Sequence, residues 1–211
     1  MTETPIVVGA DGHARCWWGT STDDYVSYHD DEWGRPVTAD QRLYEKLVLE
    51  GFQSGLSWLT ILRKRPAFRA AFADFDPHVV ARFDEADVAR LLADAGIVRH
   101  RGKIVAAITN ARAVVDVQRD SGSLAQFVWS YAPVGHEPDE RSDWSGAVPS
   151  ITATSKRLAK DLKSRGFVFL GPTTTYAFMQ AMGLVNDHLP ECHVHEQVAA
   201  QQHAVRAKMG L

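Results

Sequence analysis

The chain has 211 residues, of which 45% are hydrophobic and 23% are charged, and this composition is typical of a globular protein rather than a disordered or fibrous one. The formal net charge is −3, so no overall positive field points to a nucleic-acid partner. No apolar run approaches the roughly 18 residues that a bilayer span needs. Residues 1–15 lack the basic start and the apolar stretch of a signal peptide. We therefore expect a cytoplasmic protein.

The first half of the chain carries several helix start signals. Thr38 and Gln41 have the spacing of a capping box, which predicts that an apolar helix begins there. Pro66 predicts the first turn of another helical segment, and the pair Asp76-Pro77 repeats that signal, because proline loses no hydrogen bond at a helix start. Asp84 is a candidate N-cap for the helix that follows it.

Helical spacing continues through the second half. Gly96 is predicted to close the preceding helix in a left-handed conformation. Apolar residues then recur at helical intervals over 103–117, and Ser123 is placed to start another helix. Two further helices are predicted over 155–165 and 172–182, each followed directly by a glycine.

Strand signals are nearly absent, and only residues 167–170 are predicted to be extended. Residues 132–149 are rich in proline, glycine and charge, which predicts an irregular linker. The predicted fold class is therefore all-α. We expect a single functional unit over 16–192, a flexible N-terminal extension over 1–15 and a loosely packed C-terminal tail over 193–211.

The two cysteines of the chain lie near its opposite ends, and each has a histidine nearby. Cys16 precedes His29 by thirteen residues, and His188 precedes Cys192 by four. Two thiolates and two imidazoles form a complete tetrahedral set for Zn²⁺, and four protein ligands would make the site structural rather than catalytic. From spacing alone, two buried free thiols are an equally good interpretation, and a disulfide is less favoured.

Aromatic residues surround one acidic residue in the sequence. Trp18, Tyr28 and Trp33 flank the first two candidate ligands, while Glu50 ends an apolar helix shortly before Trp58. An aromatic-walled pocket with one carboxylate suits a flat, electron-poor ring that stacks on its faces and donates at its edge. The competing interpretation is a set of core tryptophans and one surface glutamate.

Several longer runs make a family resemblance specific. From Cys16 to Cys192 the chain resembles bacterial 3-methyladenine DNA glycosylase I, a branch of the helix-hairpin-helix glycosylases. The runs that carry the resemblance are Tyr28-His29-Asp30, Glu32-Trp33-Gly34, Leu49-Glu50-Gly51, Gly55-Leu56-Ser57-Trp58, Asp94-Ala95-Gly96-Ile97, Arg99-His100-Arg101-Gly102-Lys103-Ile104, Phe178-Met179-Gln180-Ala181 and Gly183-Leu184-Val185-Asn186-Asp187-His188. Trp17, the segment 52–54 and the longer histidine-rich tail depart from the family's pattern.

The resemblance implies a fold, an activity and a set of site residues. It implies a helix-hairpin-helix fold and a monomeric, monofunctional enzyme that flips 3-methyladenine out of alkylated double-stranded DNA. The enzyme would hydrolyse the N-glycosidic bond, leaving an abasic site and free 3-methyladenine. By resemblance, structural Zn²⁺ is held by Cys16, His29, His188 and Cys192. Glu50 would be the catalytic residue, and the base pocket would be lined by Tyr28, Trp58, Trp18 and Trp33.

Contacts with DNA are predicted more weakly. The candidate hairpin is 96–102, where Arg99, Arg101, Lys103 and backbone N–H groups at the following helix start are placed to hold a phosphate. Leu56 is a candidate wedge for the gap left by a flipped base, with packing into the core as the alternative. Further basic patches are 63–65 and the group Lys156, Arg157, Lys160, Lys163 and Arg165.

Two alternative functions remain open at this stage. One is a zinc-stabilised helical DNA-binding module without catalysis, and the other is a broad alkylbase glycosylase that would also release 7-methylguanine. The superfamily commonly uses an aspartate shortly after the hairpin, and this branch is expected to lack it. Asp116 follows the hairpin here, but its position does not match that role, so no nucleophile is assigned.

Overall fold

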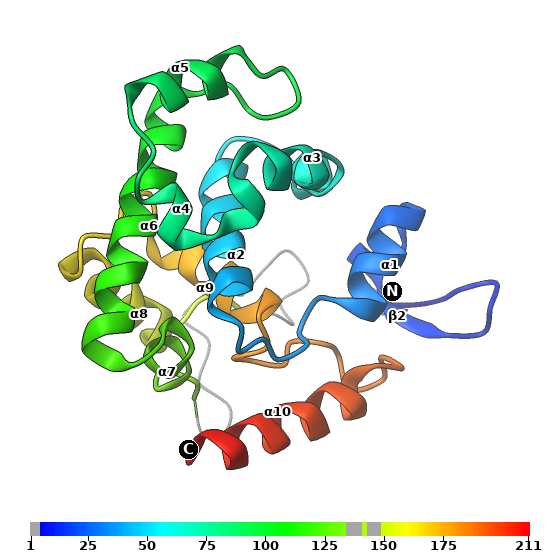
Figure 1. Cartoon of the computed structure of the whole chain (residues 1–211). Coiled ribbons are helices and arrows are strands. Elements are labelled where there is room, and N and C mark those ends of the chain that lie inside the picture. Colours follow the sequence, from blue (N-terminus) through cyan, green and yellow to red (C-terminus); the bar gives the residue numbers. More distant parts are fainter. Residues whose placement is uncertain (1–4, 134–140, 143–148) are drawn as a thin grey trace.

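The computed structural model describes residues 5–133, 141–142 and 149–211, and these residues are mostly helical (Figure 1). In chain order the elements are β1 (Ile6–Val8), β2 (Ala14–Cys16), the 3₁₀ turn η1 (Trp17–Thr20), α1 (Asp23–Asp31), α2 (Asp40–Gln53), α3 (Trp58–Ala71), the 3₁₀ turn η2 (Ala73–Phe75), α4 (Pro77–Val80), α5 (Glu85–Ala93), α6 (Arg101–Ser121), α7 (Leu124–Trp129), β3 (Arg141–Ser142), β4 (Pro149–Ile151), α8 (Ala153–Ser164), α9 (Pro172–Ala181) and α10 (His195–Met209).

Three predicted N-cap residues, whose side chains bond the first turn of their own helix, are confirmed. The Asp76 side chain accepts from the backbone N–H groups of the first turn of α4. Asp84 forms a full capping box at the start of α5, and Ser123 accepts from Gln126 N at the start of α7. These polar side chains satisfy N–H groups that have no partner inside their own helix, so the local sequence alone determines where these helices begin.

Three predicted boundaries are wrong. Thr38 does not cap a helix; Ala39 occupies the N-cap of α2 without a side-chain bond. Pro66 lies inside α3, which begins earlier because Ser57 caps it by accepting from Thr60 N. Gly96 is not left-handed; α5 ends at Ala93, and the side chain of the following C-cap residue, Asp94, accepts from Gly96 N.

The predicted strand over 167–170 is also wrong. The side chain of Asn110 on α6 bonds both the N–H and the C=O of Val168, and Phe169 adopts a left-handed φ of 60° that ends any extended run. The described strands form two short antiparallel pairs elsewhere, β1 with β2 and β3 with β4. Most of the linker predicted over 132–149 lies outside the described residues.

Helix α2 runs through the middle of the molecule, between α6 and α3 (Figure 1). Every residue from Leu43 to Phe52 on this helix is buried. Its end packs in a cluster of phenylalanine rings, in which Phe52 lies edge-on to Phe68 with ring centroids 4.8 Å apart. A helix that is buried all round must bury whatever polar residues it carries, and this places Glu50 inside the protein.

Two backbone segments meet at the end of α9. Val37 N donates to Met182 O, and the following Gly183 has a left-handed φ of 72°. A Cβ atom at Gly183 would lie 2.5 Å from the backbone nitrogen of Pro36, which is closer than real Cβ atoms approach. Glycine is therefore required here by both conformation and space.

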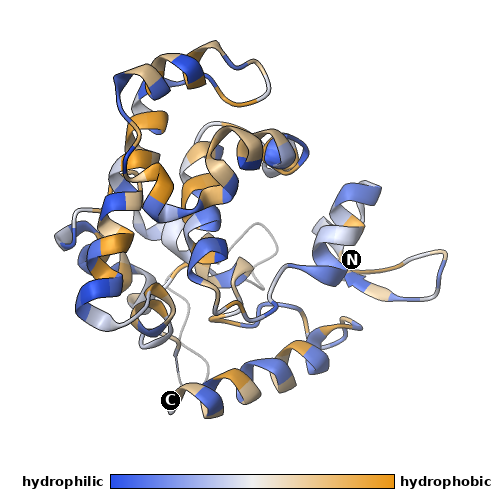
Figure 2. Ribbon diagram, viewed as in Figure 1, coloured by the Kyte–Doolittle hydropathy of each residue, from blue (hydrophilic) through white to orange (hydrophobic). Residues whose placement is uncertain are grey.

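The C-terminal tail contains α10, which the sequence analysis did not predict. This helix carries scattered hydrophobic residues among many hydrophilic ones and lies along one edge of the molecule (Figure 2). Val198 is fully buried, and Arg35 donates to Gln197 and Gln201. Within the described ranges, no helix is long and apolar enough to cross a bilayer. The division into 1–15, 16–192 and 193–211 stays a prediction.

The start of α2 generates a stability prediction. The Asp40 carboxylate accepts from the N–H groups of Leu124 and Ala125, each at 2.9 Å, and from Gln118 Nε2 at 2.7 Å. Asp40→Ala leaves these donors without an acceptor, and we expect it to lower the free energy of unfolding by about 1–3 kcal/mol. Urea denaturation measures this. The control Asp116→Ala removes an exposed carboxylate and should change stability by less than about 0.5 kcal/mol; equal losses would contradict the prediction.

Candidate functional site

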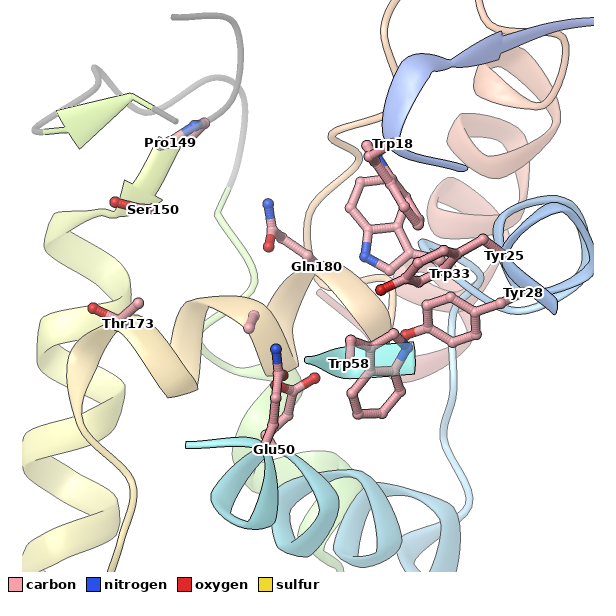
Figure 3. A pocket seen from close by; sticks show the side chains of 12 residues that line it. Trp18, Tyr25, Tyr28, Trp33, Glu50, Trp58, Pro149, Ser150, Thr173 and Gln180 are labelled. Atoms are coloured by element: carbon pink, nitrogen blue, oxygen red, sulfur yellow. The ribbon is translucent and has the colours of Figure 1, made fainter. Parts of the chain in front are cut away.

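A cavity of about 300 Å³ opens beside α2, between α1, α3 and α9 (Figure 3). Its volume lies at the lower end of the range for small-ligand sites. The residues that line it are Trp18, Tyr25, Tyr28, Trp33, Glu50, Gln53, Trp58, Pro149, Ser150, Thr173, Ala177 and Gln180. All five pocket residues predicted from sequence therefore line one cavity. Gln53, Ser150 and Thr173 also line the cavity and were not predicted from the sequence.

Local structure explains how these side chains converge. Thr22 caps α1 by accepting from Tyr25 N, and α1 then carries Tyr28 toward the cavity. Glu50 projects from the last turn of α2, and Trp58 opens α3. Figure 3 shows the aromatic rings gathered on one side of the cavity, with Glu50 on its helix to the left of Trp58.

The aromatic wall is built from one edge-to-face contact and one tilted contact. The Trp18 and Trp33 ring centroids are 4.8 Å apart with an interplanar angle of 71°, and those of Tyr28 and Trp58 are 5.4 Å apart. Such contacts fix ring orientation, because the edge of one ring favours the face of the next. Trp58 Nε1 is buried and has no hydrogen-bond partner among the described residues. An unpaired donor in a cavity wall is a feature that a bound ligand can satisfy.

Glu50 is 5% exposed, so the interpretation as a surface glutamate is wrong. The carboxylate is also not a solitary charge. Lys46, one turn earlier on α2, places its Nζ 2.8 Å from Glu50 Oε1, and both side chains are buried. Lys46 was not among the residues predicted from the sequence, although a lysine four residues before an acid on a helix is a spacing that predicts contact.

The ammonium group of Lys46 makes two further contacts. It donates to the Tyr28 hydroxyl at 2.8 Å and lies 3.3 Å from the centroid of the Trp58 ring. Burial lowers the pKa of Lys46, although the Glu50 carboxylate opposes this. Burial, together with the charge of Glu50, raises the pKa of Tyr28, which keeps its phenol neutral. The described pocket therefore contains a neutral phenol and an internally paired carboxylate.

Intramolecular contacts hold all three side chains of the basic patch predicted over 63–65, and its contact with DNA stays a prediction. Arg65 forms a bidentate pair with Glu32 at 2.5 and 2.6 Å, and Arg63 pairs with Asp24. Lys64 donates to the carbonyls of Ala95 and Gly96. The Glu32–Arg65 pair lines a second, smaller cavity of about 130 Å³ behind Tyr28 and Trp58.

The four predicted metal ligands form one buried cluster. Their ligand atoms all lie within 4.8 Å of one another. Cys192 Sγ lies 3.5 Å from His29 Nε2 and 3.6 Å from His188 Nδ1, and Cys16 Sγ lies 4.0 Å from the same nitrogen of His188. Both cysteines are free thiols rather than a disulfide. The geometry therefore brings together four donors that could hold a metal ion.

Contacts outside the cluster orient both imidazoles. His29 Nδ1 donates to Asp30 at 2.8 Å, and His188 Nε2 donates to Trp33 O at 2.9 Å, so the other nitrogen of each ring faces the sulfurs. Such partners fix the tautomer of a ligating histidine. The hydrogen bond from Cys16 lowers the pKa of the Cys192 thiol against the effect of burial. A thiolate is the form that binds metals.

The residues predicted to contact DNA divide into two groups. Lys103 does not reach outward; its Nζ donates to Phe52 O at 2.9 Å and to Ser54 O at 2.6 Å, and it is buried. Arg101 pairs with Glu85. Leu56, by contrast, is 42% exposed, which excludes the alternative that it packs into the core.

Two other sets of predicted polar residues lie on the surface. Asp116 is exposed and pairs with Arg119, so it does not line the cavity. Lys160 and Lys163 on α8 are exposed beside the loop that carries Phe169. On the same helix, Arg157 donates to Thr154, and the Arg165 guanidinium lies over the Phe127 ring.

Comparison with known proteins assigns the chain to a family. A model described as methyladenine glycosylase matches residues 18–195. The chain belongs to the methyladenine glycosylase family. It is 49% identical over 179 residues to the protein named DNA-3-methyladenine glycosylase 1 from Escherichia coli (strain K12), and the match covers 84% of this chain and 95% of that protein.

Solved structures of family members share the fold. A crystal structure of 3-methyladenine DNA glycosylase I has a TM-score of 0.79 and 48% sequence identity, covering 86% of this chain and 99% of that chain. A second structure, of a tyrosine-to-phenylalanine variant in complex with 3-methyladenine, has a TM-score of 0.78 and 38% identity, covering 86% of this chain and 97% of that chain.

The inward orientation of Lys103 generates a prediction. Lys103→Met leaves two carbonyl groups at the end of α2 without their donor, and we expect it to lower the free energy of unfolding by about 1–3 kcal/mol. The matched control Lys160→Met removes an exposed ammonium and should shift stability by less than about 0.5 kcal/mol. Urea denaturation of both variants checks this, and a stable Lys103→Met protein would contradict the structural role of Lys103.

Proposed function

We propose that this chain removes 3-methyladenine from alkylated DNA by hydrolysing the N-glycosidic bond, leaving an abasic site. The observation that carries the proposal is the buried Glu50 carboxylate in an aromatic cavity of about 300 Å³. Membership of the methyladenine glycosylase family supports the reaction class, and the related structure in complex with 3-methyladenine supports the ligand.

Glu50 is proposed to select adenine over guanine. Its carboxylate would accept a hydrogen bond from the exocyclic amine of 3-methyladenine. On 3-methylguanine the same edge carries a carbonyl oxygen, so two acceptors would face each other without a proton between them. A buried unsatisfied group costs about 1–3 kcal/mol, and more when it is charged. Discrimination by such a mismatch is sharper than discrimination by a missing methyl group.

The aromatic residues are proposed to hold the base outside the double helix. Trp58 would supply a stacking face, Tyr28 would supply a hydroxyl at the edge of the base, and Trp18 and Trp33 would complete the wall. Stacking of a base on an aromatic ring contributes about 1–3 kcal/mol, comparable to the few kcal/mol that flipping costs. A methylated base pairs poorly, so it costs least to extrude.

Base departure requires little acid catalysis in this proposal. Methylation at N3 gives the purine a positive charge, so the base leaves as a neutral molecule while the sugar passes through an oxocarbenium-like state. Glu50 is the one carboxylate among the described residues that line the cavity, and we assign no separate nucleophile. No lysine is among those residues either, and we expect no lyase activity.

The proposed DNA contacts follow the helix-hairpin-helix interpretation. Residues 96–102, at the junction of α5 and α6, would be the hairpin, and the exposed Leu56 would be the wedge that enters the gap left by the flipped base. The exposed lysines Lys160 and Lys163 are further candidates for phosphate contacts. We expect weak binding to undamaged DNA that decreases as salt rises. A monomeric state and a cytoplasmic location stay predictions.

Release of free base from alkylated DNA tests the function and the role of Glu50 together. We expect wild-type protein to release 3-methyladenine, and Glu50→Gln to lower kcat/KM by about 10–100-fold because the base loses a charged acceptor. Glu196→Gln, an exposed acid on α10, is the matched control and should retain wild-type turnover. Unchanged turnover in Glu50→Gln would show that Glu50 has no central role.

The same assay separates the alternative functions. A DNA-binding module without catalysis would release no base from any substrate. A broad alkylbase glycosylase would release 7-methylguanine as well as 3-methyladenine from the same methylated DNA. We expect 3-methyladenine alone, because the acceptor at Glu50 favours a base edge that carries an amino group.

We further propose that the cysteine–histidine cluster holds structural Zn²⁺. The donor set fits this ion, since two thiols and two oriented imidazole nitrogens converge in a buried site. Cys16, His29, His188 and Cys192 would hold it, and four protein ligands leave no position for a reactive water. The ion would stabilise the fold by joining residues from near both ends of the chain.

Metal analysis tests the zinc proposal. We expect about one zinc per purified wild-type chain, and Cys192→Ser should lose the metal and unfold at lower denaturant concentration. His203→Gln, at an exposed histidine of α10, controls for loss of an unrelated imidazole and should keep both properties. Wild-type protein that is purified without metal and gains no stability from added zinc would exclude the site.

A further inference from the structure

Lys46 is the charged partner of Glu50 among the described residues, and it lies one turn earlier on the same buried helix. Its ammonium group is fixed from three directions, by Glu50 Oε1 at 2.8 Å, by the Tyr28 hydroxyl at 2.8 Å and by the Trp58 ring at 3.3 Å. A lysine side chain loses substantial conformational entropy when it is held in one position. Three contacts that hold Lys46 against residues of the cavity therefore indicate a role for Lys46 in arranging those residues.

These contacts determine which hydrogen-bonding groups remain for a ligand. Lys46 occupies Oε1 of Glu50, while Oε2 has no hydrogen bond to any described residue. The Tyr28 oxygen accepts from Lys46, and within the described residues no acceptor is recorded for the proton of that hydroxyl. Beside Lys46 the cavity is thus left with one carboxylate oxygen as an acceptor and one phenol proton as a donor, in addition to the unpaired Trp58 Nε1 in the wall.

An adenine edge presents the complementary pair. Its exocyclic amine donates, and the neighbouring ring nitrogen accepts. We propose that Lys46 is a positioning residue that commits one oxygen of Glu50 and turns the Tyr28 hydroxyl proton outward, so that the cavity offers one acceptor beside one donor to the base. This inference rests on the proposed function, and Lys46 itself does not touch the base because it does not line the larger cavity.

Charge supports the same role. An isolated carboxylate is costly to bury, and a cation in hydrogen-bond contact offsets that cost. The other charged residues that line the smaller cavity with Lys46 are Asp31, Glu32, Arg35, Arg42, Glu45 and Arg65. Arg65 pairs with Glu32, and Arg42 pairs with Glu32 and Glu45. Lys46 is therefore the cation among the described residues that pairs with Glu50.

The test combines single and double variants. Lys46→Met removes the charge and the donor, and we expect kcat/KM for 3-methyladenine release and the affinity for free 3-methyladenine to fall by at least about tenfold. In the Glu50→Gln background the same substitution should cost no more than about threefold, because its partner is already altered. Lys208→Met, an exposed lysine near the end of α10, is the matched control and should match wild type.

The pH profile separates positioning from a structural role. Without the cation a buried carboxylate favours its protonated form, so the acidic limb of kcat/KM should move to higher pH in Lys46→Met. Lys46→Gln, which keeps a donor but not the charge, should recover part of the affinity and retain the shifted profile. It also serves if Lys46→Met does not fold.

The outcomes are distinguishable. Equal losses from Lys46→Met in the wild-type and Glu50→Gln backgrounds, with an unshifted pH profile, would overturn this inference alone. Wild-type protein that neither releases nor binds 3-methyladenine would overturn the proposed function and this inference with it.

Discussion

The ion pair between Lys46 and Glu50 is the interaction on which the candidate pocket depends. Helix α2 is buried along most of its length, so an acid near its end cannot reach solvent. Lys46 lies four residues before Glu50 on the same helix, so the helical backbone places its ammonium group beside the buried carboxylate. Tyr28 and Trp58, from α1 and α3, then pack on the ammonium group, so that three helices meet at one charge.

The cysteine–histidine cluster and the aromatic wall form one structural unit. Trp18 lies edge-on to His29 with ring centroids 5.3 Å apart, and His188 donates to the carbonyl of Trp33. Two residues that line the cavity therefore contact two residues of the cluster directly. A change in the cluster would be transmitted to the wall through these contacts, without any intervening loop. Cys16 and Cys192 bring residues from near the chain ends to this same place.

Helix caps that bond within their own first turn could be predicted from the sequence. Hydrogen bonds to partners distant in the sequence could not. Asp76 and Ser123 cap their own helices, so local spacing was sufficient. At the start of α2 the spacing of Thr38 and Gln41 was misleading, because Asp40 instead bonds the start of α7, more than eighty residues away. No local pattern reports a partner at that distance.

The same distinction applies to the site. Spacing together with the family resemblance selected the aromatic residues, Glu50 and the four candidate ligands, and the structure places each set in one location. Lys46 was missed because a lysine on a helix ordinarily faces solvent, and only the burial of α2 makes it internal. The partners of the charges over 63–65 could not be read from local sequence, because Asp24 and Glu32 precede Arg63 and Arg65 by more than thirty residues.

The contact at Gly183 has a consequence for how this pocket can diversify. There the end of α9 touches the segment after α1 through main-chain atoms, with no side chain between them. Trp33 lies three residues before Pro36, and Gln180 lies three residues before Gly183. The distance between these two parts of the cavity lining is therefore set by backbone atoms and not by side chains that a substitution could change. Substitutions can change the side chains that line the cavity. Increasing the distance between the Trp33 and Gln180 sides would require an insertion or a different backbone conformation.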